Sequence, residues 1–258
     1  MKRSMRWILP LFVLLFAWTP AAAAPVDGGR AKAVEIVDGD TLVLESGLEV
    51  RLVGIQAPKL PLDRPNFAKW PLADEAKAAL SRLALGKTLR LEYGGRERDR
   101  YGRALAHLYD QDGVWVQGAL LAEGMARVYS FRDNRFRVKE MLRHERAARA
   151  ARRGIWGHPY YRIIDAEEAP GFIGSFQLIE GTVAGVAVVA ERLYINFGTD
   201  WRSDFTVTFS PQDRRLLERA GFDYVGLKGQ RIRVRGWLKS YNGPMIEATH
   251  PEQIEVEP

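Results

Sequence analysis

Residues 37–60, VDGDTLVLESGLEVRLVGIQAPKL, decide the fold of the N-terminal half of the chain. Apolar and polar residues alternate on either side of two turns, the DGD sequence at 38–40 and the glycine at 47. Alternation bounded by glycine and aspartate predicts short strands, which we place at 33–37, 41–45 and 49–56. The loop that follows, 57–71, carries four prolines and is well placed to border a functional site.

The sequence around this stretch predicts a small barrel with helices. Residues 72–85 have helical spacing of apolar residues and end at a glycine. Strands are expected again at 88–93 and 104–109, and two further helices at 116–123 and 137–153. Five strands interrupted by a helix, with helices afterwards, predict an α+β fold built on a small β-barrel.

The C-terminal half reads as a second, mostly-β unit. Strands are expected at 177–189, 192–197, 204–209, 231–239 and 245–249, with a helix at 211–220. The dipeptide Asn242-Gly243 between the last two strands is a strong hairpin signal. The segment 158–171 shows neither helical spacing nor strand-like alternation of apolar residues, and we interpret it as a linker. We therefore expect a first domain over 31–157 and a second, OB-like barrel domain over 172–258.

Composition limits the chemistry and suggests export. The chain has 258 residues and no cysteine, which excludes disulfides, a thiol nucleophile and Cys-ligated metals. Residues 1–23 have a basic start, an apolar run and small residues near Ala23, the pattern of a signal peptide cleaved after that residue. The alternative is an uncleaved anchor, although Pro10 and Pro20 interrupt the apolar run. We expect a periplasmic or secreted protein with no stable membrane insertion after processing.

The net charge gives only a modest hint of a polyanionic partner. Processing removes three basic residues and no acids, so the formal charge falls from +6 to +3. Residues 24–157 carry 24 Lys and Arg against 18 acids, whereas residues 158–258 carry 11 against 14. The positive charge therefore belongs to the first half, where a phosphate-bearing ligand is expected. The sequence does not determine the oligomeric state.

Four residues of the first half could carry chemistry. Asp38 and Asp40 lie in a tight turn and could hold a hard cation through their oxygens. Arg51 and Arg103 could grip a phosphate by bidentate donation and neutralise developing charge. A metal with paired arginines is suited to phosphodiester chemistry. The alternative is a plain hairpin turn with solvated arginines.

Taken together, these motifs resemble the staphylococcal nuclease (thermonuclease-like) family over residues 33–156. The motifs DGDT, RLVGIQAP and YGRALA occur in the family order, and residues 112–129 and 142–156 look like the family's second and third helices. The resemblance implies an OB-type five-stranded barrel with three helices. It also implies an endonuclease that hydrolyses DNA and RNA with the aid of calcium.

The resemblance carries some site residues over intact. Asp40 matches the family's first calcium-binding aspartate, and Arg51 and Arg103 match its phosphate-binding arginines. Tyr101 matches a tyrosine that lines the nucleotide pocket. Asp38 and Thr41 are expected to contact these site residues rather than the ligand itself.

Two site positions depart from the family pattern. Gln56 stands where the family has its second calcium-binding aspartate, and Lys59 stands where it has the catalytic glutamate. The loss of a carboxylate weakens a calcium site, and an ammonium repels a divalent ion and cannot accept a proton from water. Lys59 could instead supply part of the missing positive charge and hold a phosphate directly. A compensating acid is sought among the nearby residues Asp63, Asp74 and Glu75, whereas His107 is expected to be a barrel-wall residue.

Two arginine-rich segments could add nucleic-acid contacts. Arg143, Arg146, Arg149 and Arg153 recur at helical spacing, and Arg231, Arg233, Arg235 and Trp237 share one strand face, near which Tyr194, Trp201 and Tyr241 could add stacking surface. The alternatives are a solvated helix face for the first set and a domain-docking surface for the second.

Three functions fit these observations. The first is an exported protein that binds nucleic acid or nucleotide phosphate, with hydrolysis reduced or lost because of Gln56 and Lys59. The second is an active metal-dependent nuclease with a rearranged site. The third is an envelope protein-interaction module.

Overall fold

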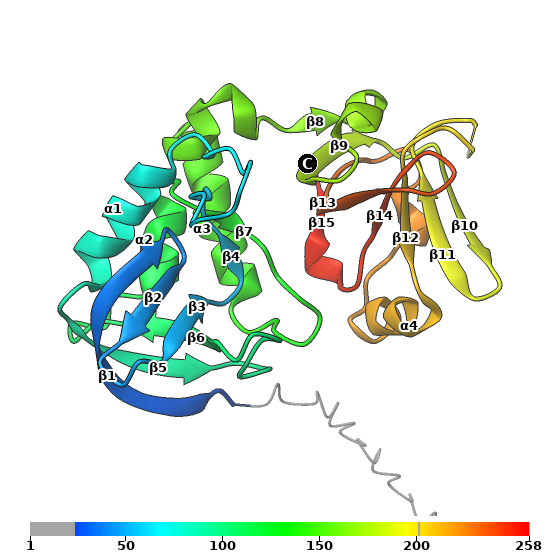
Figure 1. Cartoon of the computed structure of the whole chain (residues 1–258). Coiled ribbons are helices and arrows are strands. Elements are labelled where there is room, and N and C mark those ends of the chain that lie inside the picture. Colours follow the sequence, from blue (N-terminus) through cyan, green and yellow to red (C-terminus); the bar gives the residue numbers. More distant parts are fainter. Residues whose placement is uncertain (1–23, 201, 258) are drawn as a thin grey trace, which may run out of the picture.

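The computed structural model describes residues 24–200 and 202–257. The predicted signal peptide, residues 1–23, and Trp201, considered above as stacking surface, lie outside this described part. Within it, none of the helices combines the length and apolar character needed to cross a bilayer. Figure 1 shows two β-rich bodies side by side, with the connecting segment arching over both.

The first body is a closed five-stranded barrel with the strand order β1-β2-β3-β6-β5. Strands β3 and β6 run parallel, and the other neighbours run antiparallel. This is the predicted α+β, OB-type barrel. Its strands are β1 (Val26–Asp38), β2 (Thr41–Leu44), β3 (Glu49–Leu52), β5 (Thr88–Tyr93) and β6 (Ala104–Tyr109).

The predicted strand at 49–56 is divided in two. Gly54 has a φ of 81°, which ends β3 and turns the chain into the short strand β4 (Ile55–Gln56). β4 pairs with β7 (Arg127–Val128), a strand that the sequence did not indicate. This pair places residues 55–56 next to the chain between the second and third helices.

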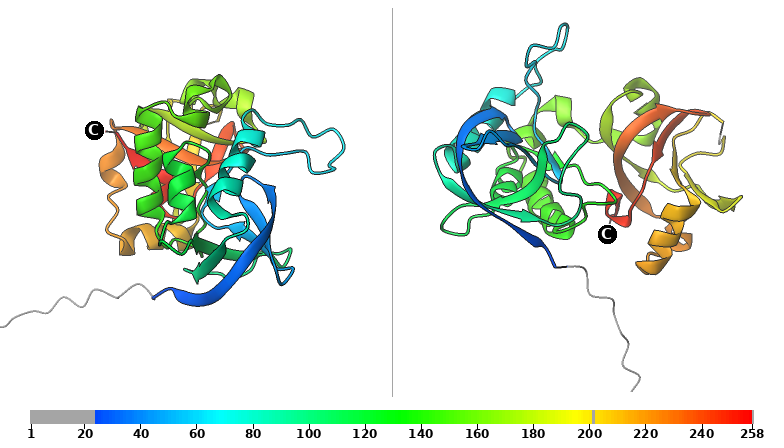
Figure 2. Two further views of the ribbon diagram at one scale, coloured as in Figure 1. Left: turned by 90° about the vertical axis from the view of Figure 1, so that its left-hand side faces the viewer. Right: turned by 60° about the horizontal axis from the view of Figure 1, so that its bottom comes forward.

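Three helices cover the barrel where the sequence predicted them. They are α1 (Ala73–Ala84), α2 (Val116–Ala122) and α3 (Val138–Ala150). Each buries the apolar side of its helical repeat, such as Ala76 and Leu80 in α1 or Met141 in α3, against the barrel leucines and valines. The loop at 57–71 projects from this body, as the cyan segment of Figure 2 shows.

The second body is mostly β, as predicted, and repeats the strand order of the first. Its sheet runs β10-β11-β12-β14-β13-β9-β8, and β15 also pairs with β13. β9 and β10 are consecutive parts of one extended segment, and β12 and β14 are parallel, like β3 and β6. The helix α4 follows β12, just as α1 follows β3 and the short β4 in the first body. The elements are β9 (Phe176–Thr182), β10 (Gly185–Val189), β11 (Arg192–Asn196), β12 (Thr206–Phe209), α4 (Pro211–Arg219), η4 (Val225–Leu227), β13 (Arg231–Ser240), β14 (Pro244–Glu247), η5 (Pro251–Gln253) and β15 (Ile254–Val256).

The segment expected as a linker carries regular structure. The 3-10 helix η1 (Gly154–Gly157) lies just before it. The segment itself holds the 3-10 helices η2 (Pro159–Tyr161) and η3 (Ala166–Phe172), and β8 (Ile164–Asp165), which pairs with β9. Tyr161 is buried, and its hydroxyl donates a hydrogen bond of 2.6 Å to the carbonyl of Pro71. The connector is therefore fixed to the first body as well as to the second.

A buried ionic cluster joins the two bodies. Arg235 of β13 is only 2% exposed and pairs with Glu145 of α3 at 2.9 Å and with Glu255 of β15. Arg149 of α3 also pairs with Glu255, at 2.8 Å. Burial alone would raise the pKa of Glu255, but the arginines beside it hold that pKa at about 2.

This cluster removes one arginine from each of the two surfaces considered from the sequence. Arg149 and Arg235 both pair with buried glutamates at the joint between the two bodies, so neither is free to bind a polyanion. Arg231 and Arg233 pair with Glu180 on the neighbouring strand. The domain-docking alternative is therefore the one that the contacts of the second body support.

Candidate functional site

The DGDT turn holds two buried carboxylates at the end of β1. Asp38 is 3% exposed and Asp40 is fully buried. The backbone N–H of Asp40 donates to Asp38 Oδ1 at 3.0 Å, which fixes the turn. A Cβ at Gly39 would lie 2.7 Å from the Cβ atoms of Ala57 and Ala76, so only glycine allows α1 and the chain after β4 to approach this closely.

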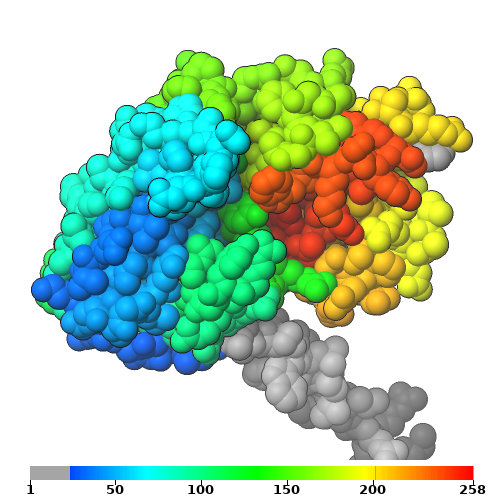
Figure 3. All heavy atoms as spheres, viewed as in Figure 1, coloured from blue at the N-terminus to red at the C-terminus, as the bar shows by residue number. Residues whose placement is uncertain are grey.

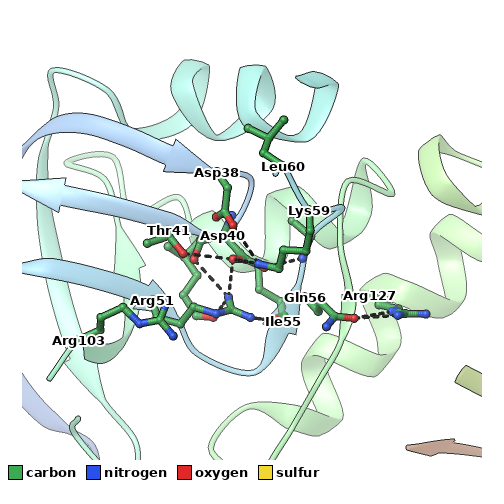
Figure 4. Close-up of polar contacts among 12 residues, drawn as sticks. Asp38, Asp40, Thr41, Arg51, Ile55, Gln56, Lys59, Leu60, Arg103 and Arg127 are labelled. Atoms are coloured by element: carbon green, nitrogen blue, oxygen red, sulfur yellow. Dashed lines mark hydrogen bonds and ion pairs between the residues drawn. The ribbon is translucent and has the colours of Figure 1, made fainter. Parts of the chain in front are cut away.

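Both carboxylate oxygens of Asp40 contact donors of the protein itself. Oδ1 accepts from Lys59 Nζ at 2.6 Å, lies 2.9 Å from an Arg51 nitrogen, and accepts more weakly from the Thr41 hydroxyl at 3.3 Å. Oδ2 accepts from the backbone N–H of Ala57 at 2.7 Å. Figure 4 shows Lys59 reaching from the loop after β4 to the centre of this group.

Lys59 bridges the two aspartates. Its ammonium donates to Asp38 Oδ2 at 3.0 Å as well as to Asp40, and its side chain is 18% exposed. Burial would raise the pKa of Asp40, but Arg51 and Lys59 hold that pKa at about 2. Burial and the charge of Asp40 raise the pKa of Asp38 above its ordinary value, and Lys59 opposes this. The Arg51 guanidinium and the Lys59 ammonium therefore together keep Asp40 charged in a buried position.

Gln56 points away from the aspartates. Its Oε1 accepts two hydrogen bonds from Arg127, at 3.0 Å from Nε and 2.8 Å from an Nη atom. Arg127 is itself buried, which lowers its pKa to about 10. In this arrangement the carbonyl oxygen of Gln56, predicted as a weak metal ligand, satisfies a buried cation instead (Figure 4).

This donor set does not fit the calcium ion that the family implies. A calcium site needs several oxygens with negative charge and lone pairs to spare. Here both oxygens of Asp40 are engaged, Gln56 serves Arg127, and the Lys59 ammonium lies against the aspartates. Among residues 24–200 and 202–257, no three His, Asp or Glu side chains gather as a metal-binding group.

Arg51 connects the aspartates to an open pocket. Its guanidinium donates to three backbone carbonyls, those of Asp40, Leu52 and Ile55, and so has a fixed orientation. On its other side it lines a pocket of about 460 Å³ together with Arg103 and Tyr101. The structure thus brings both predicted phosphate-binding arginines and the predicted tyrosine to one cavity.

Arg103 and Tyr101 are held by the turn between β5 and β6. Arg103 pairs with Asp99 at 2.7 Å, and Asp99 Oδ1 also accepts the backbone N–H groups of Tyr101 and Arg103. The Tyr101 ring is 67% exposed and lies 5.4 Å from the Arg103 guanidinium. Asp99 therefore fixes the Arg103 guanidinium, and both Arg100 and Arg103 lie against the exposed Tyr101 ring at this side of the pocket.

Sequence reasoning missed other residues of the pocket. Arg96 and Arg100 add positive charge to its lining, and Tyr129 and Phe131 add aromatic rings. The charged stretch at 96–103 was visible in the sequence, but nothing there indicated that the chain after β7 forms the opposite wall. The second body supports that wall, since Trp237 donates from its indole N–H to the Tyr129 hydroxyl at 2.8 Å.

None of the three acids sought as substitutes reaches the site. Asp74 pairs with Lys69 at the surface at 2.6 Å, and Asp63 and Glu75 are exposed. His107 is a buried barrel residue that accepts from the Trp115 indole at 3.3 Å, as expected. Burial lowers its pKa to about 4, so its imidazole is neutral at physiological pH.

Comparison with known proteins identifies the family. The family model for staphylococcal nuclease homologues matches residues 49–158. An uncharacterized endonuclease from Escherichia coli O157:H7 is 34% identical over 172 residues, which cover 66% of this chain and 97% of that protein. The chain belongs to the staphylococcal nuclease homologue family.

Other relatives agree with this assignment. The thermonuclease of Staphylococcus hyicus is 28% identical over 130 residues, covering 49% of this chain and 75% of the relative. An endonuclease from Bacillus subtilis is 32% identical over 150 residues, covering 54% of this chain and 70% of the relative. The predicted resemblance and the barrel fold are therefore confirmed, and the fold is that of a nuclease-like hydrolase family.

Proposed function

We propose that this protein binds nucleic acid through its phosphates at the pocket lined by Arg51 and Arg103, and that calcium-dependent hydrolysis there is reduced or lost. The contact of Lys59 with both Asp38 and Asp40 carries this proposal, because it places an ammonium against the carboxylates that would otherwise hold the metal. Family membership and the names of the relatives support nucleic acid as the ligand.

The charges of the pocket favour a phosphodiester ligand. Four arginines line it, against the acids Asp99 and Asp133, and Asp99 orients one of those arginines. Aromatic rings on two walls provide surfaces for a base or a sugar. Tyr101 lies at the open edge, where a base could stack beside the phosphate held by Arg103. Export through the predicted signal peptide at 1–23 is part of this proposal and places the ligand outside the cytoplasm.

The active-nuclease alternative requires a general base and a metal position. Neither Lys59 as an ammonium nor the surface acids of the loop supply the base. The alternative predicts metal-dependent cleavage by the wild-type protein that is lost in Arg51→Ala.

The binding site is tested with Arg103→Ala. The change should lower affinity for single-stranded DNA about ten- to hundredfold, since a charge-assisted hydrogen bond contributes about 1.5–3 kcal/mol. Arg231→Ala, which removes an exposed arginine paired with Glu180 in the second body, is the matched control and should bind as the wild type does. Equal affinities for all three proteins would refute the assignment of the pocket.

A further inference from the structure

The proline-rich loop and the connector together form an exposed row of aromatic rings beside the site. The Phe67 ring stacks on Trp70, with ring centres 6.3 Å apart and planes 23° apart. Trp70 in turn lies 6.0 Å from Tyr160 of η2. Tyr160 is 51% exposed, and the other two rings are half-buried. Figure 3 shows the loop and the connector next to each other on one face of the molecule.

The row begins beside Lys59, the residue that bridges the aspartates. The backbone N–H of Trp70 donates to the carbonyl of Lys59 at 3.0 Å, so the first large ring is tied to the residue that bridges the aspartates. The Trp70 ring also lies 5.9 Å from the Arg127 guanidinium, which binds Gln56. Lys59 and Arg51 share Asp40 Oδ1, so the rings lie two contacts away from the Arg51 side of the pocket.

Positive charge continues beyond the rings. Next to Tyr161, a cavity of about 320 Å³ at the end of α3 is lined by Arg149, Arg152 and Arg162 and by no acid. Arg149 and Arg162 have carboxylate partners, whereas Arg152 is exposed and has no ion-pair partner within residues 24–200 and 202–257. Cations thus lie at both ends of the aromatic row.

We propose that Trp70 and Tyr160 form a stacking track for single-stranded nucleic acid, along which a strand runs from the Arg51 pocket toward Arg152. Phe67 stacks on Trp70 and is covered by Arg64, whose guanidinium lies 3.7 Å from its ring centre, so it supports Trp70 and adds a cation. Every base has a flat face that can stack on an aromatic ring, so such a track accepts single strands with little sequence preference. The inference rests on the proposed function, because it extends the strand held at that pocket.

A second aromatic surface is the main competitor for this role. Tyr194 and Tyr241 line a pocket of about 430 Å³ in the second body, together with Asn196, Thr206 and other uncharged residues. That pocket has no cation in its lining, whereas three arginines line the cavity next to Tyr161. Electrostatics therefore place a polyanion on the track rather than on the second body.

The experiment compares two ligands by fluorescence anisotropy. A labelled thymidine dinucleotide with a 5′-phosphate reports the pocket alone, and an oligothymidylate of about twelve nucleotides reports the pocket and the track. Tyr160→Ala should weaken binding of the longer strand about five- to hundredfold, from about 1–3 kcal/mol of stacking per base. It should leave binding of the dinucleotide unchanged.

Three controls separate stacking from structural damage. Tyr160→Phe keeps the ring and should bind both ligands as the wild type does. Trp70→Leu keeps apolar volume without the large ring and should also weaken only the longer strand. Tyr241→Ala removes the most exposed ring of the competing pocket, at 66% exposure, and should change neither affinity.

The outcomes distinguish the two proposals. If the longer strand binds no more tightly than the dinucleotide, or if only Tyr241→Ala weakens it, the track is wrong while the pocket stands. If the dinucleotide fails to bind but the longer strand still depends on Tyr160, the pocket is wrong and the track stands.

Discussion

The double substitution Gln56→Asp with Lys59→Glu should convert the site into one that binds calcium. The wild-type ammonium lies 2.6 Å from Asp40 Oδ1. A calcium ion bound to that oxygen, at about 2.4 Å, would lie within about 5 Å of the ammonium. With an effective dielectric constant of about 20, the repulsion between the two charges is about 7 kcal/mol, or about five orders of magnitude in affinity.

The substitution reverses this repulsion. Lys59→Glu removes one positive charge and adds a negative one, and Gln56→Asp adds another negative charge, so the net charge of the site falls by three. Calcium binding is measured by isothermal titration calorimetry, and cleavage of single-stranded DNA and RNA is followed across a calcium titration. Lys69→Glu, which makes the same charge change on an exposed residue of the same loop, is the control and should bind no calcium.

Two results would refute the reasoning. One is a wild-type protein that cleaves with calcium and loses this activity in Arg103→Ala, since the ammonium would then be no obstacle. The other is a folded double mutant that still binds no calcium, since the scaffold would then lack more than charge and ligands.

Two stability predictions follow from buried charges and imidazoles. Arg235→Met should lower the free energy of unfolding by about 3–5 kcal/mol, because buried Glu145 loses its nearest cation and keeps only Arg149, at 3.5 Å, as an ionic partner. Urea unfolding measures this loss, and an equal loss in the exposed-site control Arg231→Met would contradict the reasoning. Burial lowers the pKa of His250 to about 4, so the folded protein keeps it neutral while the unfolded chain takes up a proton below about pH 6.5. The free energy of unfolding should therefore fall by up to about 3 kcal/mol as the pH drops from about 6.5 to 4. In thermal melts, His250→Asn should lose less stability than the wild type over that range. An equal loss in both proteins would show that His250 does not contribute.

Local sequence patterns were sufficient for most of the fold. Alternation and turn glycines located the barrel strands, and helical spacing located α1, α2 and α3 within one or two residues at most ends. Both signals depend on neighbours in the sequence, so they can be read without knowing the packing. The short pair β4 and β7 was missed because each strand has two residues and its partner is distant in the sequence.

Only part of the candidate site could be predicted from local sequence patterns. Motifs identified Asp40, Arg51, Arg103 and Tyr101, and they showed that Gln56 and Lys59 are unusual. They did not show that Lys59 would reach back to both aspartates, or that Gln56 would turn to Arg127. Those contacts join side chains from separate elements, and such pairing depends on three-dimensional distance.

The family and the barrel could be predicted from the sequence, because they depend on local periodicity and short motifs, and the same motifs predict Arg51 and Arg103 as phosphate-binding residues. The tertiary structure alone decided the state of the site and the role of the second body. An ammonium settles against the aspartates because burying two carboxylates without a cation is costly. Arg235 faces Glu145 and Glu255 for the same reason, so a strand that resembles a nucleic-acid platform instead holds the two bodies together.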